Sequence, residues 1–492
     1  MPTPSFASSI SQPFSYSATQ RVVHCSVWLA CTLAGTALAQ TDASTQAVWR
    51  ATSRLGYGPS AATMQAAQSN AKAWASQQID LAQTASQRSP SLPAELAGIN
   101  APINTLVQSF HAEREARKTL REQRATPVAA GADPSVIAAN DPERFSRSMQ
   151  QEAAAWRVMS CSDPALENPL LARMTEFWFN HLNVFVGKGP VRPFVGHYAL
   201  NVIRANALGK FEDLLLASAK HPAMLLYLDQ AQSNNRGLNE NYARELMELH
   251  TLGVNGGYTQ NDVHALARIL TGWTVPIAQG EGFRFAPRLH DTGSKTLMGV
   301  QYDNHGISEG EDAIRFLARH PATAQRISTR LARFFVADTP PPALVERLVK
   351  TYMATQGDIR ALLHTLVDAP EFWAADNQLF KTPLDFACSA LTAAGGARER
   401  RDIVQTLGFL AQAGQPMHGW QTPDGYKTDA ATWLAPEALT RRADFAIALG
   451  QRIAEPTYLN AFLSEPTRAR LAQEALPLRT GLLLASPDFM RK

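Results

Sequence analysis

Hydrophobic residues recur at intervals of three and four along most of the chain, the spacing that places them on one face of an α-helix. Such segments follow one another from about residue 143 to residue 485, and further helices are expected near 49–56 and 61–81. One interval differs, because residues 282–285 and 295–299 flank a polar turn and alternate in character, which predicts a β-hairpin. The pattern predicts a mainly α fold, a multi-helix, bundle-like body with one small β-hairpin insertion.

In the stretch from Asn239 to Gly253, charged and large apolar residues alternate more closely than elsewhere in the chain. As a helix it places its polar side chains within an arc of roughly 140° and its apolar side chains opposite. Asn239 is a favourable N-cap, and Gly253 can close the helix in the left-handed conformation. The residues of the polar arc are Glu240, Asn241, Arg244, Glu245 and Glu248.

Two interpretations of this arc compete. Glu240 and Glu248 each lie four positions from Arg244, so a ladder of ion pairs explains the arc without any function. In the functional interpretation the arc, with Asn241, faces a cleft: Arg244 grips an anion, and Glu245 or Glu248 acts as acid or base. A metal site is a third reading of the same residues.

A second candidate is the loop that separates the two expected strands. His290, Asp291 and Lys295 bring a base, a carboxylate and an amine into six residues, and polar loops on a helical scaffold often carry sites. We expect them to share the cleft with the polar arc. The alternative is a turn stabilised by hydrogen bonds of the Asp291 side chain, with no further role.

Two histidines fall on apolar faces. His250 lies on the side of its helix away from the carboxylates, and His181 shares a stripe with aromatic side chains. We expect each to be a buried, neutral imidazole bonded to a backbone carbonyl; the alternative is that they share a metal or haem. No metal ligand is assigned, and the cofactor stays unknown.

The N-terminal residues have the pattern expected of a targeting signal. Residues 27–39 are apolar and small, follow Arg21 and end in Ala37-Leu38-Ala39, so we expect residues 1–39 to be a secretory signal peptide. The run is too short for a spanning helix, and no other apolar run of 18 residues follows, so no membrane span is expected after signal removal. The protein is therefore expected to be exported, periplasmic or extracellular.

Removal of that signal leaves two cysteines, Cys161 and Cys388, which either pair as a disulfide or stay buried and separate. A net charge of +3 is too small to imply a nucleic-acid partner. Proline, glycine and alanine concentrate in 126–142, which we expect to be a flexible loop or linker. It separates an N-terminal helical segment, 40–125, from the main helical domain, 143–492, although the two can form one continuous body.

Several motifs together resemble the bacterial domain of unknown function 1800 family, from about Trp49 to the C-terminus. The resemblance implies export and a partner, because such proteins are often encoded beside a second family that resembles the sulfatase and alkaline-phosphatase fold. It carries over no catalytic role, and Arg330 departs from it where lysine is expected. The motifs lie at 177–181, 206–211, 222–229, 239–253, 256–259, 270–274, 290–295, 320–324 and 381–383.

No Walker loop, dinucleotide-binding glycine motif, CxxC pair or serine-hydrolase elbow occurs in the chain. The leading hypothesis is an exported enzyme whose carboxylate and arginine cleft acts on an anionic or polyhydroxylated substrate. The competing hypothesis is a non-catalytic binding or assembly protein that docks the partner on the same face.

Overall fold

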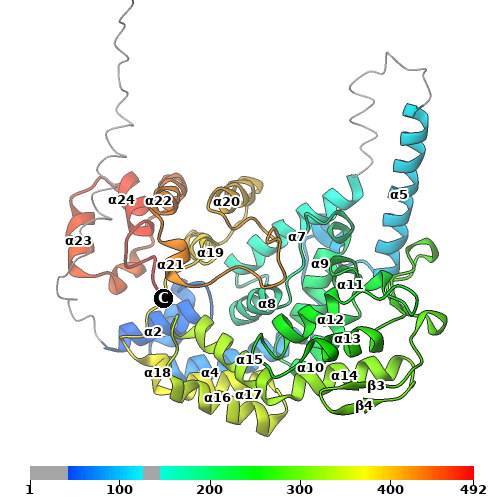
Figure 1. Cartoon of the computed structure of the whole chain (residues 1–492). Helices are drawn as coiled ribbons and strands as arrows, with labels where there is room; N and C mark the ends of the chain where they lie inside the picture. The colour runs from blue at the N-terminus through cyan, green and yellow to red at the C-terminus, as the bar shows by residue number, and fades with distance from the viewer. Residues whose placement is uncertain (1–42, 126–143) are drawn as a thin grey trace, which may run out of the picture.

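The computed structural model of the chain describes residues 43–125 and 144–492. The expected signal peptide, 1–39, and the expected linker, 126–142, lie outside these residues. The described chain is mainly helical, as predicted, with two very small antiparallel sheets. Figure 1 shows α5 standing away from the body, while α22 and α24 lie together on the opposite side.

The helices run through the whole described chain. The α-helices up to the sheets are α2 (Ala43–Arg54), α3 (Ala61–Ala67), α4 (Ala71–Ser86), α5 (Ile103–Ala125), α7 (Arg144–Ser162), α8 (Pro169–His181), α9 (Val195–His197), α10 (Phe211–Ala219), α11 (Pro222–Tyr227), α12 (Asn241–Glu245) and α13 (Gln260–Ile269). Those after the sheets are α14 (Ile307–Arg319), α15 (Pro321–Phe335), α16 (Pro342–Thr355), α17 (Ile359–Asp368), α18 (Pro370–Trp373), α19 (Pro383–Ala393), α20 (Arg400–Gln412), α21 (Ala430–Trp433), α22 (Pro436–Gly450), α23 (Glu465–Ala472) and α24 (Leu476–Leu484).

Short helical turns of other kinds connect them. The 3-10 turns are η1 (Ala94–Asn100), η2 (Gly189–Phe194), η4 (Gln230–Gln232), η6 (Ile277–Gln279), η7 (Pro287–Leu289) and η8 (Thr457–Phe462). The π-helical turns, in which the backbone bonds reach one residue further than in an α-helix, are η3 (Tyr198–Arg204) and η5 (Leu246–His250).

Two expected helices are each divided in the structure. The predicted 61–81 helix consists of α3 and α4, because Asn70 begins a new helix by accepting the N–H of Ala73 on its side chain. The last part of the helical pattern, which was expected to run to about residue 485, consists of α23 and α24, with Pro477 in the first turn of α24. Proline is tolerated there because the first N–H groups of a helix have no partner within it.

The strands do not pair as expected. β2 (Arg284–Phe285) pairs with β1 (Trp273–Thr274), and β3 (Lys295–Leu297) pairs with β4 (Val300–Tyr302), so the predicted pairing of 282–285 with 295–299 is wrong. Met298 and Gly299 both have positive φ, 48° and 84°. Two such residues form a tight hairpin turn, which folds β3 back onto the next residues of the chain.

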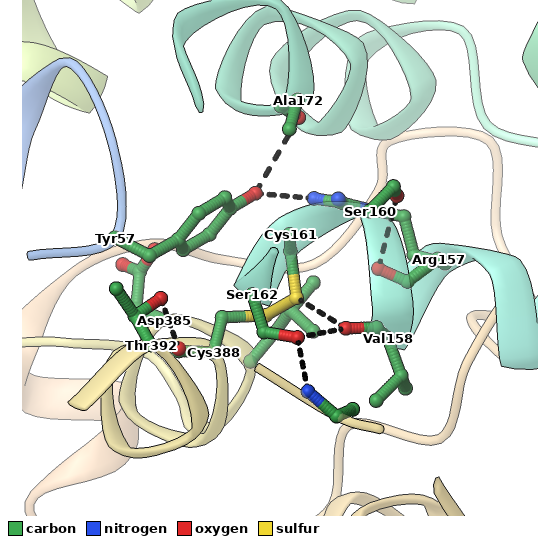
Figure 2. The surroundings of a disulfide bond; sticks show 12 residues. Tyr57, Arg157, Val158, Ser160, Cys161, Ser162, Ala172, Asp385, Cys388 and Thr392 are labelled. Carbon is green, nitrogen blue, oxygen red and sulfur yellow. Dashed lines mark hydrogen bonds between the residues drawn. A yellow bond between two sulfur atoms is a disulfide. The ribbon is translucent and has the colours of Figure 1, made fainter. Parts of the chain in front are cut away.

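A disulfide between Cys161 and Cys388 joins α7 to α19 across 227 positions (Figure 2). Of the two alternatives for these cysteines, pairing is the one that the structure has. Buried side chains of 43–125 and of 144–492 belong to one hydrophobic core. Arg54 links the two parts directly, because its buried guanidinium donates a hydrogen bond to the carbonyl of Phe372 at 2.5 Å.

Within the described residues, no helix has both the length and the apolar character that crossing a bilayer requires.

Candidate functional site

The stretch from 239 to 253 is helical, but its winding changes from α in α12 to π in η5. Asn239 accepts the N–H of Asn241 on its side chain at 2.9 Å, but the N-cap of α12 is Glu240, so the N-cap expected at Asn239 is wrong by one residue. The Thr251 hydroxyl donates to the carbonyl of Leu246 at 2.6 Å, which satisfies an acceptor at the start of the π turn. Gly253 has φ +85°, the left-handed conformation expected of it.

Arg244 lies on the outer side of this helix. It donates to Glu240 Oε2 at 3.1 Å and to Gln260 Oε1 at 2.9 Å, and its side chain is 41% exposed. Gln260 also donates to Glu240, so the three side chains form a surface network between α12 and α13. Asn241 is exposed and donates to the carbonyl of Leu228 at 3.3 Å. These residues therefore have structural partners already.

Glu245 and Glu248 differ from Glu240. Both are half-buried, and among the described residues none donates a hydrogen bond to either carboxylate. Burial raises the pKa of Glu245, the nearby carboxylates of Glu248 and Asp424 raise it further, and Arg244 opposes them in part. Glu245 thus binds a proton more tightly than an ordinary glutamate does.

Two arginines of α15 complete the surroundings of these acids. Arg326 donates to the carbonyl of Leu249 at 2.9 Å, and the charges of Glu248 and Arg326 lie close enough to affect each other. Arg330 follows one turn later, and burial beside the Arg326 guanidinium lowers the pKa of Arg330 to about 10. The described part of the chain supplies no hydrogen-bond acceptor to Arg330. Arg330 differs in this from Arg244, which donates to both Glu240 and Gln260.

Asp424 comes from a loop that is held firmly against α8 and α11. The buried Asn183 side chain donates to the carbonyls of Trp420 and Thr422 at 3.0 and 2.9 Å, and Tyr227 donates to that of Gln421 at 2.7 Å. Burial first, and then the negative charge of Glu245, raises the pKa of Tyr227. The loop thereby brings a third carboxylate to the two of the helix.

We call these side chains the Glu245 cluster. Its members come from α11, α12, η5, α15 and two loops, and each either affects the pKa of another member or has its own pKa affected by one. They are Tyr227, Glu245, Glu248, Tyr258, Arg326, Arg330 and Asp424.

His181 and His250 lie under this cluster in the core. Each side chain is about 1% exposed, and a ring nitrogen of His181 is 2.9 Å from the carbonyl oxygen of His250. Burial and the charges of Arg326 and Arg330 lower the pKa of both, that of His250 to about 3. The expectation of a buried, neutral imidazole bonded to a backbone carbonyl is confirmed for His181. For His250 it is only partly right, because the ring is buried but its Nε2 has no hydrogen-bond partner among the described residues.

The 290–295 loop forms a separate, closed network around Glu309 of α14. The Glu309 carboxylate lies 2.8 Å from His290 Nε2 and 2.8 Å from Lys295 Nζ, and all three side chains are buried. Arg268 of α13 donates to both oxygens of Asp291 at 2.7 and 3.0 Å and lowers the pKa of that carboxyl. His290 and Lys295 are therefore brought together around Glu309, an acid that the sequence analysis did not single out, while the Asp291 carboxylate beside them pairs with Arg268.

The structure does not join this loop to the polar arc by any hydrogen bond of the described residues. The polar arc contacts α13 through Gln260, at the start of that helix, and the loop contacts it through Arg268, near the end. Eight residues of helix separate these positions by about 12 Å along the axis.

Sequence reasoning missed Arg326, Asp424 and Tyr227, and noted Arg330 only as a departure from a family pattern. The signal for the two arginines was their spacing, because residues four apart lie on the same face of a helix. Asp424 carried no signal, since its position depends on the path of a loop. Histidine, cysteine, aspartate and glutamate side chains do not gather in groups of three that could hold a metal ion anywhere in 43–125 or 144–492.

Fold and site together define a mainly helical protein with a half-buried cluster of carboxylates and arginines. The chain belongs to the family described as protein of unknown function (DUF1800), which it matches over residues 50–491. No curated protein and no solved structure matches it.

Proposed function

We propose that the protein is an exported enzyme that acts on an anionic or polyhydroxylated substrate at the Glu245 cluster. Glu245 exchanges a proton with the substrate, and Arg330 binds its negative charge or its hydroxyl oxygens. One observation supports this most directly: a carboxyl with a raised pKa and a guanidinium without a protein acceptor lie in the same cluster.

The chemistry follows from the surroundings of each group. General acid and base catalysis works best when the pKa of the catalytic group approaches the working pH, and the environment of Glu245 moves its pKa in that direction. Arg330 presents a planar guanidinium that matches carboxylate, phosphate or sulfate oxygens. Glu248 and Asp424 keep the proton on Glu245, because like charges disfavour its ionised form.

This proposal moves anion binding from Arg244 to Arg330, because Arg244 already bonds to Glu240 and Gln260. His290, Asp291 and Lys295 enter it as a support that ties the end of α13 to α14, rather than as groups that touch substrate.

Export is part of the proposal. It is supported by the apolar segment 27–39 and by the Cys161–Cys388 disulfide, because structural disulfides persist in oxidising compartments. Mass spectrometry of the protein from a periplasmic or extracellular fraction should find a mature start at Gln40 and an intact disulfide. Recovery of the uncleaved chain with free thiols from the cytoplasm alone would contradict export.

The enzymatic proposal is tested by offering the mature protein uronic acids, sugar phosphates, sugar sulfates and neutral oligosaccharides. We expect turnover of at least one compound, and Glu245→Gln should lower kcat by about 10²- to 10⁴-fold. Arg330→Gln should weaken binding of a charged substrate by about tenfold or more, because a hydrogen bond to a charged group is lost.

Arg315→Gln is the matched control, since it removes a guanidinium that pairs with Asp312 on α14, outside the Glu245 cluster, and should leave both constants unchanged. Turnover that survives Glu245→Gln would overturn the assigned role of that residue. The non-catalytic alternative makes a different prediction: no turnover, and capture of an exported partner with a sulfatase-like or alkaline-phosphatase-like fold that depends on Arg330.

A further inference from the structure

Helix α5 stands away from the body of the protein in Figure 1, and a hollow of about 570 Å³ is lined by α5 on one side. Residues of η2, α11, η4 and η6 line the other side. Cavities of this volume are large enough to hold small organic molecules. None of the described residues that line the hollow belongs to the Glu245 cluster. We call it the α5 hollow.

Hydrogen bonds fix α5 to its surroundings at two points along the helix. In its first turn, the Asn104 side chain accepts the N–H of Gly282 at 3.1 Å. Further along, the buried Glu113 carboxylate accepts the N–H of Ser146 at 2.9 Å and also the Ser146 hydroxyl. On the other wall, a Cβ atom added at Gly189 would meet no atom within 4 Å. The α5 hollow is therefore an open space between elements that hydrogen bonds hold in place.

Part of the surface of the α5 hollow is apolar. Phe110 and Val275 are buried, and Leu226 and Ile277 are half-buried. The Phe110 ring also packs edge-on against Phe194, with centroids 5.6 Å apart, which fixes its position. An apolar ring or chain that covers these side chains leaves water, and the hydrophobic effect favours that transfer.

The charged side chains that line the α5 hollow are all arginines among the described residues. Arg114 and Arg117 come from α5, and Arg192 comes from η2 on the other wall. The Arg114 guanidinium is exposed and lies over the Phe110 ring, 6.0 Å from its centroid. Even when the Glu113 carboxylate behind Ser146 is counted, positive charges outnumber negative ones here. Such a surface attracts anions, and the planar guanidinium matches the oxygens of a carboxylate, phosphate or sulfate.

We infer that the α5 hollow binds an organic anion in which a carboxylate, sulfate or phosphate group is joined to an apolar ring or short alkyl body. The anionic group pairs with the arginines, and the body covers Phe110 and Val275. An uncharged or cationic molecule with the same body lacks the ion pairs. An anion without the body lacks the apolar contacts, so both parts of the ligand contribute.

The probes are naphthalene-2-sulfonate, 2-naphthalenemethanol, 2-naphthylmethylamine and methanesulfonate, titrated into the mature protein by calorimetry. The first three share a ring and differ in charge, and the last keeps the sulfonate without the ring. We expect naphthalene-2-sulfonate to bind more tightly than each of the others by about tenfold or more. A smaller preference over any of them, or no binding of naphthalene-2-sulfonate, would overturn the inference. This ranking uses the unaltered chain and so does not depend on the folding of a variant.

Arg114→Glu then locates the site. Because Arg114 is exposed, the fold tolerates the change, and the new carboxylate repels the sulfonate, so its affinity should fall by about tenfold or more. Arg468→Glu is the matched control, since it reverses an exposed guanidinium that pairs with Glu465 on α23, outside the hollow. It should leave the affinity unchanged. Unchanged affinity in Arg114→Glu, or an equal loss in both variants, would overturn the inference.

Arg330→Gln separates the α5 hollow from the Glu245 cluster. Arg330 is the guanidinium proposed to bind anions at that cluster, and it does not line the α5 hollow. Naphthalene-2-sulfonate should bind this variant as it binds the unaltered protein, whether or not the cluster turns over a substrate. Loss of binding in Arg330→Gln would place the probe at the Glu245 cluster and overturn the assignment of a separate site.

Discussion

Glu240 and Glu245 lie five positions apart at the start of one helix, yet they meet different chemical conditions. Glu240 accepts hydrogen bonds from Arg244 and Gln260 near the surface. Glu245 is half-buried among other acids, and the described chain donates no hydrogen bond to its carboxylate. Replacing a group that lies in unfavourable surroundings usually stabilises the fold. The stability of a variant at Glu245 therefore gives a test that does not depend on the substrate.

Glu245→Gln should raise the thermal stability of the protein at pH 7 to 8. The raised pKa means that the folded state binds the proton more tightly than the unfolded state, so stability falls as the pH rises through both pKa values. The gain should therefore vanish below about pH 4, where the unfolded carboxyl is also protonated. Thermal melts of both proteins across this pH range check it, and a variant that is less stable at pH 8 would contradict the electrostatic account.

For the buried ion network around Asp385 we expect the opposite effect: replacing the acid should lower the stability of the protein. Arg173 and Lys492 pair with Asp385 in the core and hold its pKa well below the usual range. Asp385→Asn should cost about 3–5 kcal/mol at pH 7, because the removed charge leaves buried cations uncompensated. The cost should shrink as the pH falls below about 4, where the unfolded carboxyl takes up a proton.

Chemical denaturation at pH 7 and at pH 3 measures the loss of unfolding free energy in Asp385→Asn at each pH. Asp312→Asn is the control, because its carboxylate is 63% exposed and pairs with Arg315 at the surface. We expect the control to change stability by less than about 1 kcal/mol at either pH.

At the level of single residues, the sequence predicted which face of the 239–253 helix is polar, and that His181 and His250 face inward. It did not distinguish Arg244 from Arg330 as the guanidinium without protein partners. That distinction depends on neighbours from other elements: Arg244 donates a hydrogen bond to Gln260 on α13, whereas Arg330 has the charges of Arg326, Asp424 and Arg333 around it and no hydrogen-bond acceptor in the described chain. Periodicity along one helix contains no information about neighbours from another.

Among the elements, the π turn η5 has the most direct effect on the Glu245 cluster. It carries Glu248, and the carbonyl of Leu249 within it accepts the bond that fixes Arg326. Constant rotation of 100° per residue cannot predict such a change of winding. The hairpin illustrates the same limit, because the turn at Met298 and Gly299 was hidden in a stretch that also reads as one strand.

Thr251→Val tests how strongly the π turn η5 depends on the hydrogen bond from the Thr251 hydroxyl to the carbonyl of Leu246. The buried Thr251 hydroxyl donates to Leu246, so the variant keeps the volume but leaves a carbonyl without that partner, at a cost of about 1–3 kcal/mol. Amide hydrogen exchange over 246–253 should become faster. In Thr355→Val, which removes the same kind of bond at the end of α16, exchange over 246–253 should not change.

For the molecule as a whole, the sequence was sufficient for the fold class and for the helical character of most of 143–485, because regular amphipathic segments repeat through the chain. The sequence could not decide whether Cys161 and Cys388 form a disulfide, because residues 227 positions apart give no local signal of their distance in space. Only the packing of α7 against α19 brings Cys161 to Cys388.

Replacement of both cysteines by alanine should lower stability by about 5 kcal/mol, because a closed loop of this length strongly restricts the unfolded chain. The unaltered protein treated with a reductant should melt at the same temperature as the variant. The variant itself should not respond to the reductant, and equal melting of oxidised and reduced protein would contradict a structural role for the bond.

The same cross-link closes the backbone between Cys161 and Cys388 into a covalent ring that carries Glu245, Glu248, Arg326 and Arg330. A protease that nicks this ring once cannot release either piece. The cut protein should migrate as one species on a non-reducing gel, separate into two when the bond is reduced, and until then keep its acids and arginines attached to one another.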